Sequence, residues 1–279
     1  MPGQEGIVLT VLSWNLFHGR DFPPDPALRT WRSKLLRTSE RNETHIQVNR
    51  PLFEEFAGWI EQRSWRVAFL QEAPPRWFEA LARRARAHGT LAFTSRNLGA
   101  PVRRAIAELN PDLIASNEGG SNQLLLRPPG RITDVRRETL ALLPERRVMQ
   151  FARLDLAEGR RVCAANLHAS AGLPRAAWAE VERAADLAVA WAGADPLVFG
   201  GDLNLRPKSA PQVFERLRDR FGLESPTGPN AIDHLLARGL DVVEPPTRLA
   251  PEDREVAGPG GLRIRLSDHA PVLATFGMK

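Results

Sequence analysis

Six apolar runs in the sequence end in, or contain, residues that can bind a metal ion or transfer a proton. Strand ends are rigid platforms, so polar side chains at these places are candidates for a functional site. Carboxylates and amides offer the hard oxygen ligands that magnesium prefers, and histidines titrate near neutral pH. Together such groups can hydrolyse a phosphoester, with a divalent ion polarising a phosphoryl oxygen and a carboxylate positioning water. The candidates are Asn15, Glu72, Asn166, His168, Asp202, Asn204, Asp233, Asp268 and His269.

Each candidate also has a purely structural explanation. A single Asn or Asp after a strand is usually a turn residue or a helix cap. Asp233 is different, because it lies inside the apolar run 231–236 and a buried carboxylate needs a partner. Four other histidines and two tryptophans are interpreted as structural: His18, His45, His88 and His234, with Trp14 and Trp65 in the core.

The elements that must position the candidates follow from the apolar pattern. Residues 7–15 form a β-branched and apolar run that is typical of a buried strand. Pro51 opens an amphipathic helical pattern, and proline is well placed in a first helical turn. Further strands are predicted at 67–71, 123–126, 148–156, 161–167, 197–199, 231–237 and 272–276, and further helices at 75–87, 101–109, 174–192 and 209–220.

Strands follow one another in the middle of the chain, whereas helices and strands alternate on both sides. This order predicts a mixed α/β fold with sheets packed face to face and helices outside them. No repeat or low-complexity tract is visible, so residues 1–279 are expected to form one domain. The segment 20–50, rich in proline and arginine, is expected to be a loop with one short helix, and 245–261 a surface loop.

Composition and charge exclude several classes of protein. The 279 residues are 43% hydrophobic and 25% charged, as in ordinary globular proteins, which excludes a disordered or fibrous chain. No run approaches the ~18–20 apolar residues of a membrane span, and no secretory signal is visible, so a cytoplasmic location is expected. The single cysteine, Cys163, excludes an internal disulfide and a zinc site built on several cysteines. The net charge of +5 is compatible with a phosphate-bearing partner but does not require one.

Six motifs occur in an order that resembles the endonuclease/exonuclease/phosphatase (deoxyribonuclease I-like) superfamily. The most specific pair is Gly-Gly-Asp-Leu-Asn at 200–204 with Ser-Asp-His-Ala-Pro at 267–271. The others are Ser-Trp-Asn at 13–15, Leu-Gln-Glu at 70–72, Asn-Leu-His at 166–168 and Ile-Asp-His at 232–234. The resemblance implies the fold of this superfamily, a four-layer α/β/β/α sandwich in which two packed mixed β-sheets are flanked by helices. It also implies that the site lies at one end of the paired sheets.

The resemblance also implies a metal ion and a positioned water. Glu72 would bind Mg²⁺, or alternatively Mn²⁺, with Asn15 and Asp268 in or just behind its ligand shell. Asp202 would orient or deprotonate the attacking water, and Asn204 would hold the phosphate or the nucleophile. The identity of the general base is left open between the Asp and His candidates.

The remaining roles that the resemblance implies concern the phosphate. His269, oriented by Asp233, would contact the scissile phosphate and stabilise its developing charge, and His168 would assist the leaving oxygen. Asn166 belongs to the His168 motif and is expected on the substrate side. Asn122 precedes a predicted strand, where it either contacts the substrate or caps a turn.

The expected activity is a divalent-metal-dependent phosphodiesterase acting on nucleic acid, as an endo- or exonuclease, by attack of water on phosphorus. The alternative is a phosphatase or phosphodiesterase acting on a small-molecule, inositol or lipid phosphoester. The absence of tyrosine argues against an exonuclease III-type repair enzyme, which usually carries a tyrosine near the His168 position.

Two further alternatives stay open. A catalytically inactive binding module should lack one of Glu72, Asp202, Asn204 or His269, and all four are present. The stretch between Asn15 and Glu72 is long for the superfamily, so the basic residues within 20–50 are either a substrate-binding insertion or a solvated face. No obligate protein partner is evident.

Overall fold

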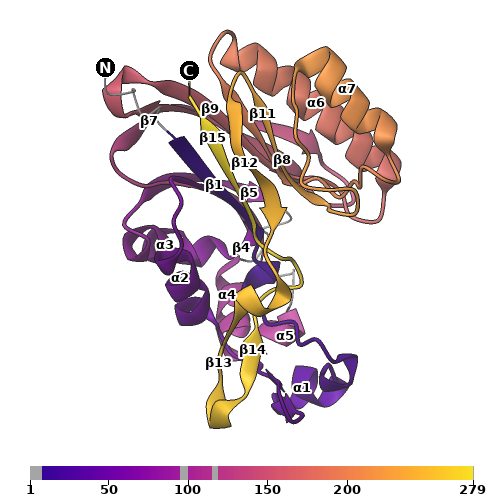
Figure 1. Ribbon diagram of the computed structural model, residues 1–279. Helices are drawn as coiled ribbons and strands as arrows, with labels where there is room; N and C mark the ends of the chain where they lie inside the picture. Colours follow the sequence, from indigo (N-terminus) through magenta and orange to yellow (C-terminus); the bar gives the residue numbers. More distant parts are fainter. Residues whose placement is uncertain (1–7, 95–99, 115–118, 279) are drawn as a thin grey trace.

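Two mixed β-sheets pack face to face at the centre of the molecule, and helices cover the outer face of each (Figure 1). This computed structural model describes residues 8–94, 100–114 and 119–278. The arrangement confirms the predicted α/β/β/α sandwich. The first sheet has the order β12 (Asp241–Arg248), β15 (Val272–Gly277), β1 (Val8–Asn15), β4 (Val67–Ala73), β6 (Gly120–Leu126) and β5 (His88–Thr94). The second has the order β11 (Asp233–Arg238), β10 (Leu197–Asp202), β9 (Arg161–His168), β8 (Arg147–Leu156) and β7 (Gly130–Ala141).

Each sheet contains one parallel pair, β1 with β4 and β9 with β10, among antiparallel neighbours. Parallel strands end at the same edge of a sheet, so residues at their carboxyl ends are brought together. In the first pair Asn15 lies opposite Gln71, and in the second Asp202 lies opposite His168. The topology therefore gathers the polar strand ends at one end of the sandwich.

Three apolar clusters hold the four layers together. Between the sheets, Phe69 and Leu124 pack with Leu154 and Val198. On the outer face of the first sheet, Trp14 packs against Phe56 and Trp59 of α2 (Phe53–Gln62), and α3 (Phe78–Arg84) contributes Leu81 and Ala82 to the same cluster. The helices α6 (Pro174–Ala192) and α7 (Pro211–Phe221) cover the second sheet, and the buried face of α6 is mostly alanine.

Three strands that the apolar pattern did not predict, β5, β7 and β12, are edge strands. Edge strands face solvent more than central ones, so their side chains need not be apolar, and they tolerate proline. β12 is almost entirely exposed and contains Pro245 and Pro246. The expectation of a surface loop over 245–261 is therefore wrong. This stretch contains the end of β12, η6 (Pro251–Arg254), β13 (Glu255–Ala257) and η7 (Pro259–Gly261), and β13 pairs with β14 (Arg263–Arg265).

The segment 20–50 lies beyond the end of the sandwich, near β13 and β14 (Figure 1). It contains the expected short helix, α1 (Trp31–Leu36), together with η2 (Pro26–Leu28) and the two-residue strands β2 (Glu40–Arg41) and β3 (Ile46–Gln47). The short helix α5 (Pro111–Ile114), which follows α4 (Ala100–Leu109), packs on α1. Of the helices in the described ranges, none has the length and apolar character needed to cross a membrane.

Candidate active site

Asp202, at the carboxyl end of β10, lies at the centre of the candidate site and is almost completely buried. Its Oδ2 accepts a hydrogen bond from Asn15 Nδ2 (3.0 Å), and its Oδ1 accepts one from the backbone N–H of Asn204 (3.1 Å). Oδ2 also lies 3.5 Å from His168 Nε2 and 3.8 Å from His269 Nε2. Burial raises the pKa of this carboxyl to about 7, against the opposing effect of His269. A carboxyl with this pKa can take up or give up a proton near neutral pH.

His269 is held by Asp233, with Nδ1 2.9 and 3.0 Å from the two carboxylate oxygens. The ring therefore directs Nε2 towards Asp202. Trp14 fixes the backbone of the same residue, because its indole N–H donates to the His269 carbonyl (2.9 Å). Burial lowers the pKa of the imidazole, but the carboxylates of Asp233 and Asp202 outweigh it and raise the pKa to about 10. The pairing confirms the suspicion that the carboxylate of Asp233, within its apolar run, has a partner.

Glu72 is turned into the site by an irregularity in β4. The register between β4 and β6 shifts between Leu70 and Ala73, and Glu72 has a left-handed φ of 46°. Such a bulge re-aims a side chain, and non-glycine residues at positive φ concentrate at functional sites. Glu72 Oε2 lies 3.1 Å from His18 Nε2, and Oε1 lies 3.8 Å from His168 Nε2. Although burial works to raise its pKa, His18 and the other histidines hold the pKa of Glu72 well below its usual range.

His168 ends β9 and contacts a cation that the sequence motifs did not indicate. Arg147 Nη1 lies 3.2 Å from His168 Nδ1, and Arg147 Nη2 forms an ion pair with Glu145 at 2.9 Å. Burial, and then the charge of Arg147, lower the pKa of His168 to about 3. The imidazole is therefore neutral near neutral pH, unlike that of His269.

Asp268 has one buried carboxylate oxygen, Oδ1, that accepts no hydrogen bond from the described residues, although His269 Nε2 lies 3.9 Å from it. Burial raises the pKa of this carboxyl, and the charge of Glu72 raises it further. The neighbouring Ser267 fixes the loop to β1, since its hydroxyl donates to the Asn15 carbonyl (2.7 Å) and accepts from the His269 N–H (3.0 Å). An orphaned buried carboxylate oxygen beside a second carboxylate is a place where a cation is favourable.

The two predicted substrate-contacting residues, Asn122 and Asn166, join the sheets instead. Asn166 accepts from Gln71 Nε2 (2.8 Å) and donates to the Gln123 carbonyl (2.9 Å) in the facing sheet. Asn122 donates to the Val148 carbonyl (2.8 Å), likewise across the sandwich. Both side chains are fully buried, and neither lines the pocket at the site. The structure therefore places them as inter-sheet anchors beneath the site, not on its surface.

An open pocket of about 270 Å³ adjoins Glu72 and His168. Its lining includes Glu72 and His168, with Arg20, Arg147 and His18 around them. Asn204 lies beside Asp202, to which its backbone N–H donates (3.1 Å), and its side-chain amide donates to the Ala169 carbonyl (2.9 Å). A phosphoester entering this pocket meets carboxylates and histidines at its floor and guanidinium groups in its walls.

The structure places His18, interpreted from the sequence as a structural residue, beside a candidate site residue. Its Nε2 lies 3.1 Å from Glu72 Oε2, and it lines the same pocket. His18 lies three positions beyond Asn15 in η1 (Phe17–Gly19), and this proximity to a candidate strand end was the available signal. His234 agrees with the structural interpretation, because backbone atoms hold its ring: the Thr227 N–H (3.1 Å) and the carbonyls of Leu205 and Ala231 (3.0 Å each) all contact it. His45 contacts Glu255 away from the site, and His88 is exposed on β5.

Residues 12–269 match the model of the endonuclease/exonuclease/phosphatase family. The chain belongs to this family, whose members hydrolyse phosphoesters. A comparison with curated protein sequences finds no match.

Several solved structures have the same fold as this chain. The catalytic domain of human Nocturnin, solved with a bound sulfate anion, has a TM-score of 0.65 at 17% identity, covering 98% of this chain and 95% of that one. A truncated TDP2 from Caenorhabditis elegans has a TM-score of 0.59 at 16% identity and 97% coverage of both chains. A mannosyl-6-phosphatase from Bacteroides thetaiotaomicron has a TM-score of 0.62 at 14% identity, covering 95% and 98%. At these identities the likeness establishes the fold alone.

Proposed function

We propose that the protein is a divalent-metal-dependent phosphodiesterase that acts on nucleic acid by attack of water on phosphorus. The observation that carries the proposal is the convergence of two histidines and an asparagine on the buried Asp202. This arrangement suits a water held by a carboxylate beside a phosphate held by imidazole groups. The basic side chains of the pocket wall, Arg20 and Arg147, favour a substrate with negative charge beyond the scissile group.

Glu72 and Asp268 fit a hard divalent cation such as Mg²⁺ or Mn²⁺. They offer carboxylate oxygens, one of which has no hydrogen-bond partner, and no thiolate lies among them. When bound, the ion would polarise a phosphoryl oxygen and neutralise part of the substrate's charge. We assign Asn15 to a position behind these ligands. Its Oδ1 already accepts a hydrogen bond from the Phe17 N–H (3.0 Å), and its side-chain N–H group donates one to Asp202.

A second group of ligand atoms, from Asp202, Asp233 and His269, lies within 4.8 Å of one another. We assign this group to proton transfer and not to the metal. His269 Nδ1 and the Asp233 carboxylate already bond to each other, so a cation there would have to break that pair. Glu72 Oε2 lies 3.1 Å from His18 Nε2, which leaves Glu72 Oε1 and the Asp268 Oδ1 atom as the oxygens that we propose for the metal.

The roles of the protein's own groups follow from this assignment. Asp202 orients the attacking water and accepts its proton. His269, directed by Asp233, donates a hydrogen bond to a non-bridging phosphate oxygen, and Asn204 holds the water or the phosphate. His168 contributes an uncharged imidazole beside Arg147, which leaves Arg147 as the nearby cation for the leaving oxygen.

The likeness to a mannosyl-6-phosphatase favours a second candidate, hydrolysis of a small phosphoester. The two candidates differ in their response to salt. Nucleic-acid binding releases counterions from the phosphate backbone, so it weakens steeply as salt rises, whereas a small substrate depends on salt far less.

Nicking of supercoiled plasmid with Mg²⁺ or Mn²⁺ tests the proposal, beside EDTA and Asp202→Ala controls. We expect metal-dependent nicking that the substitution abolishes. Bis(4-nitrophenyl) phosphate, a small diester, is assayed in parallel. Hydrolysis of this diester with an intact plasmid would contradict the nucleic-acid assignment and support the small-substrate candidate, whereas activity on neither would contradict a phosphodiesterase.

A further inference from the structure

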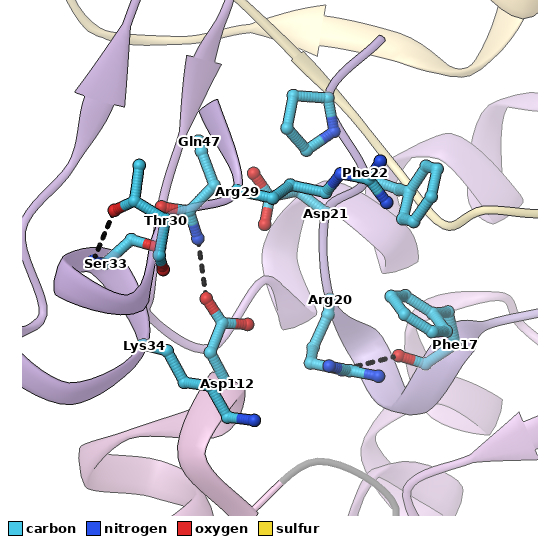
Figure 2. A pocket seen from close by; sticks show the side chains of 11 residues that line it. Phe17, Arg20, Asp21, Phe22, Arg29, Thr30, Ser33, Lys34, Gln47 and Asp112 are labelled. Carbon is cyan, nitrogen blue, oxygen red and sulfur yellow. Dashed lines mark hydrogen bonds between the residues drawn. The ribbon is translucent and has the colours of Figure 1, made fainter. Parts of the chain in front are cut away.

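A second pocket, of about 230 Å³, adjoins the candidate active site and is built largely from the segment 20–50 (Figure 2). Phe17 and Arg20 line both pockets, so the two share a wall. Small-molecule sites usually measure ~300–1,000 Å³. The second pocket is therefore large enough for one chemical group of a ligand, and the rest of that ligand would lie in the active-site pocket.

Three basic side chains line this pocket: Arg20, Arg29 and Lys34. Among the residues that the structure describes, none of the three forms an ion pair within 4 Å. The Arg20 guanidinium lies over the Phe17 ring (3.8 Å to its centroid), and its Nε donates a hydrogen bond to the Phe17 carbonyl (3.3 Å). Arg29 stacks on Phe22 in the same way (4.3 Å). Stacking on a ring fixes the direction of a guanidinium and leaves its other N–H groups free for a ligand.

Two carboxyl groups also line the pocket, and each accepts a hydrogen bond from a neighbouring group. Asp112 Oδ2 accepts from Gln47 Nε2 (2.6 Å), as Figure 2 shows. Asp21 Oδ2 accepts from the Val48 N–H (3.0 Å), and burial raises the pKa of Asp21 to about 8. Asp21 is therefore largely uncharged near neutral pH, and the positive charge of the pocket exceeds the negative.

A further polar atom in the pocket wall is the side-chain oxygen of Gln47. Gln47 is 3% exposed, and its buried Oε1 accepts no hydrogen bond from the part of the chain that the structure describes. A buried amide oxygen in this state is costly unless a donor reaches it. A ligand that carries a hydroxyl or a protonated phosphate oxygen supplies such a donor, whereas a purely apolar group does not.

We infer that this second pocket binds another phosphate group of the same substrate whose scissile phosphoester occupies the first pocket, with Arg20 between the two and Arg29 and Lys34 at the rim. The inference rests on the proposed function, and it narrows the substrate to one with at least two phosphate groups on neighbouring positions. It also assigns the segment 20–50 to substrate binding. From the sequence alone, the basic residues of this segment were either a substrate-binding insertion or a solvated face.

Two chromogenic substrates that differ by one phosphate test the inference. They are thymidine 5′-(4-nitrophenyl phosphate) and its 3′-phosphorylated counterpart, from which hydrolysis releases 4-nitrophenolate. We expect the wild-type protein to favour the 3′-phosphorylated substrate about tenfold or more in kcat/KM, as charge-assisted hydrogen bonds to one added phosphate allow. The Arg29→Gln/Lys34→Gln variant should lose the preference and keep its rate on the other substrate.

Arg32→Gln/Arg41→Gln is the matched control, because both residues are exposed, lie in the same segment and are outside the pocket. It removes the same charge and should keep the preference. Equal rates of the wild type on the two substrates would overturn the inference while leaving the proposed function intact. So would a preference that both double variants lose equally, since general charge would then explain it.

Binding without catalysis separates the inference from the proposed function. In EDTA, thymidine 3′,5′-bisphosphate should bind the wild-type protein more tightly than thymidine 5′-monophosphate in a calorimetric titration. The Arg29→Gln/Lys34→Gln variant should bind the two equally. If neither chromogenic substrate is hydrolysed but the wild-type protein still binds the bisphosphate more tightly, the second phosphate site is supported and the proposed reaction is contradicted. Equal wild-type affinities contradict the second site.

Discussion

The side-chain amide of Asn15 donates to Oδ2 of Asp202 across 3.0 Å and so joins the end of β1 in one sheet to the end of β10 in the other. Both residues are almost completely buried. The bond orients the Asp202 carboxylate and at the same time links the two sheets at the floor of the site. A loss of this bond therefore affects both catalysis and stability.

Asn15→Ala should destabilise the protein by about 1–3 kcal/mol, because it leaves a buried carboxylate oxygen without its donor. Urea unfolding followed by tryptophan fluorescence measures this change. Asn230→Ala, at an exposed position, is the control and should unfold like the wild type. An Asn15→Ala midpoint equal to that of the wild type would show that the bond contributes no stability.

Asp233→Asn should lower kcat by about 10²–10⁴-fold with little change in KM, because the neutral amide no longer holds His269 as a directed, charged donor. The measurement is steady-state hydrolysis of bis(4-nitrophenyl) phosphate. Asp219→Asn, on the exposed end of α7, provides the control. A fall confined to KM would instead place Asp233 in substrate binding.

Removal of the metal, or of its proposed ligand, should inactivate the protein. Glu72→Gln should weaken Mn²⁺ binding by at least about tenfold, since a carboxylate ligand loses its charge. Calorimetric titration with Mn²⁺ gives the affinity independently of activity. Glu79 is an exposed glutamate in α3, and the control variant Glu79→Gln should bind Mn²⁺ with the wild-type affinity. Unchanged Mn²⁺ affinity in Glu72→Gln would exclude Glu72 as a ligand.

Gly201→Ala should destabilise the fold severely, by roughly 3 kcal/mol or more. Gly201 has a φ of 120°, and an added Cβ would lie 2.1 Å from the Leu167 carbonyl oxygen of the neighbouring strand. Gly58→Ala, in α2, is the matched control, because nothing lies within 4 Å of its added Cβ and alanine favours a helix. In thermal unfolding, the Tm of Gly58→Ala should equal or exceed that of the wild type, and the Tm of Gly201→Ala should be well below it. The reverse order would show that the neighbouring strand leaves room for a side chain at position 201.

Stability should fall in acid partly through Glu255. Burial acts to raise its pKa, but hydrogen bonds from His45, Arg265 and Arg263 outweigh this and lower the pKa to about 2. The ordinary value is 4.5, so the ionised group stabilises the folded state above that pH. The contribution is lost as the pH falls from there towards 2. The free energy of unfolding, measured with urea, should fall less between about pH 5.5 and about pH 3.5 for Glu255→Gln than for the wild type. Equal decreases would show that Glu255 does not contribute.

Much of the fold was predictable because buried elements carry a clear apolar pattern. The predicted helix over 174–192 matches the bounds of α6. The interior strands β1, β4, β9 and β10 were all predicted. Of the edge strands, β11 was predicted, but β5, β7 and β12 were not, because solvent exposure weakens the apolar pattern on which the prediction depends.

The sequence by itself determined the order of the motifs, the residue types at the strand ends and hence the class of chemistry. Only the tertiary structure decided which of those residues meet. It turned Asn122 and Asn166 into the interface between the sheets, and it brought in His18 and Arg147. It also placed Arg20 between two pockets. The physical reason is that these roles depend on where a side chain points after a bulge, a left-handed turn or a strand crossing. Local sequence patterns record burial and periodicity, but not the direction in which distant segments approach one another.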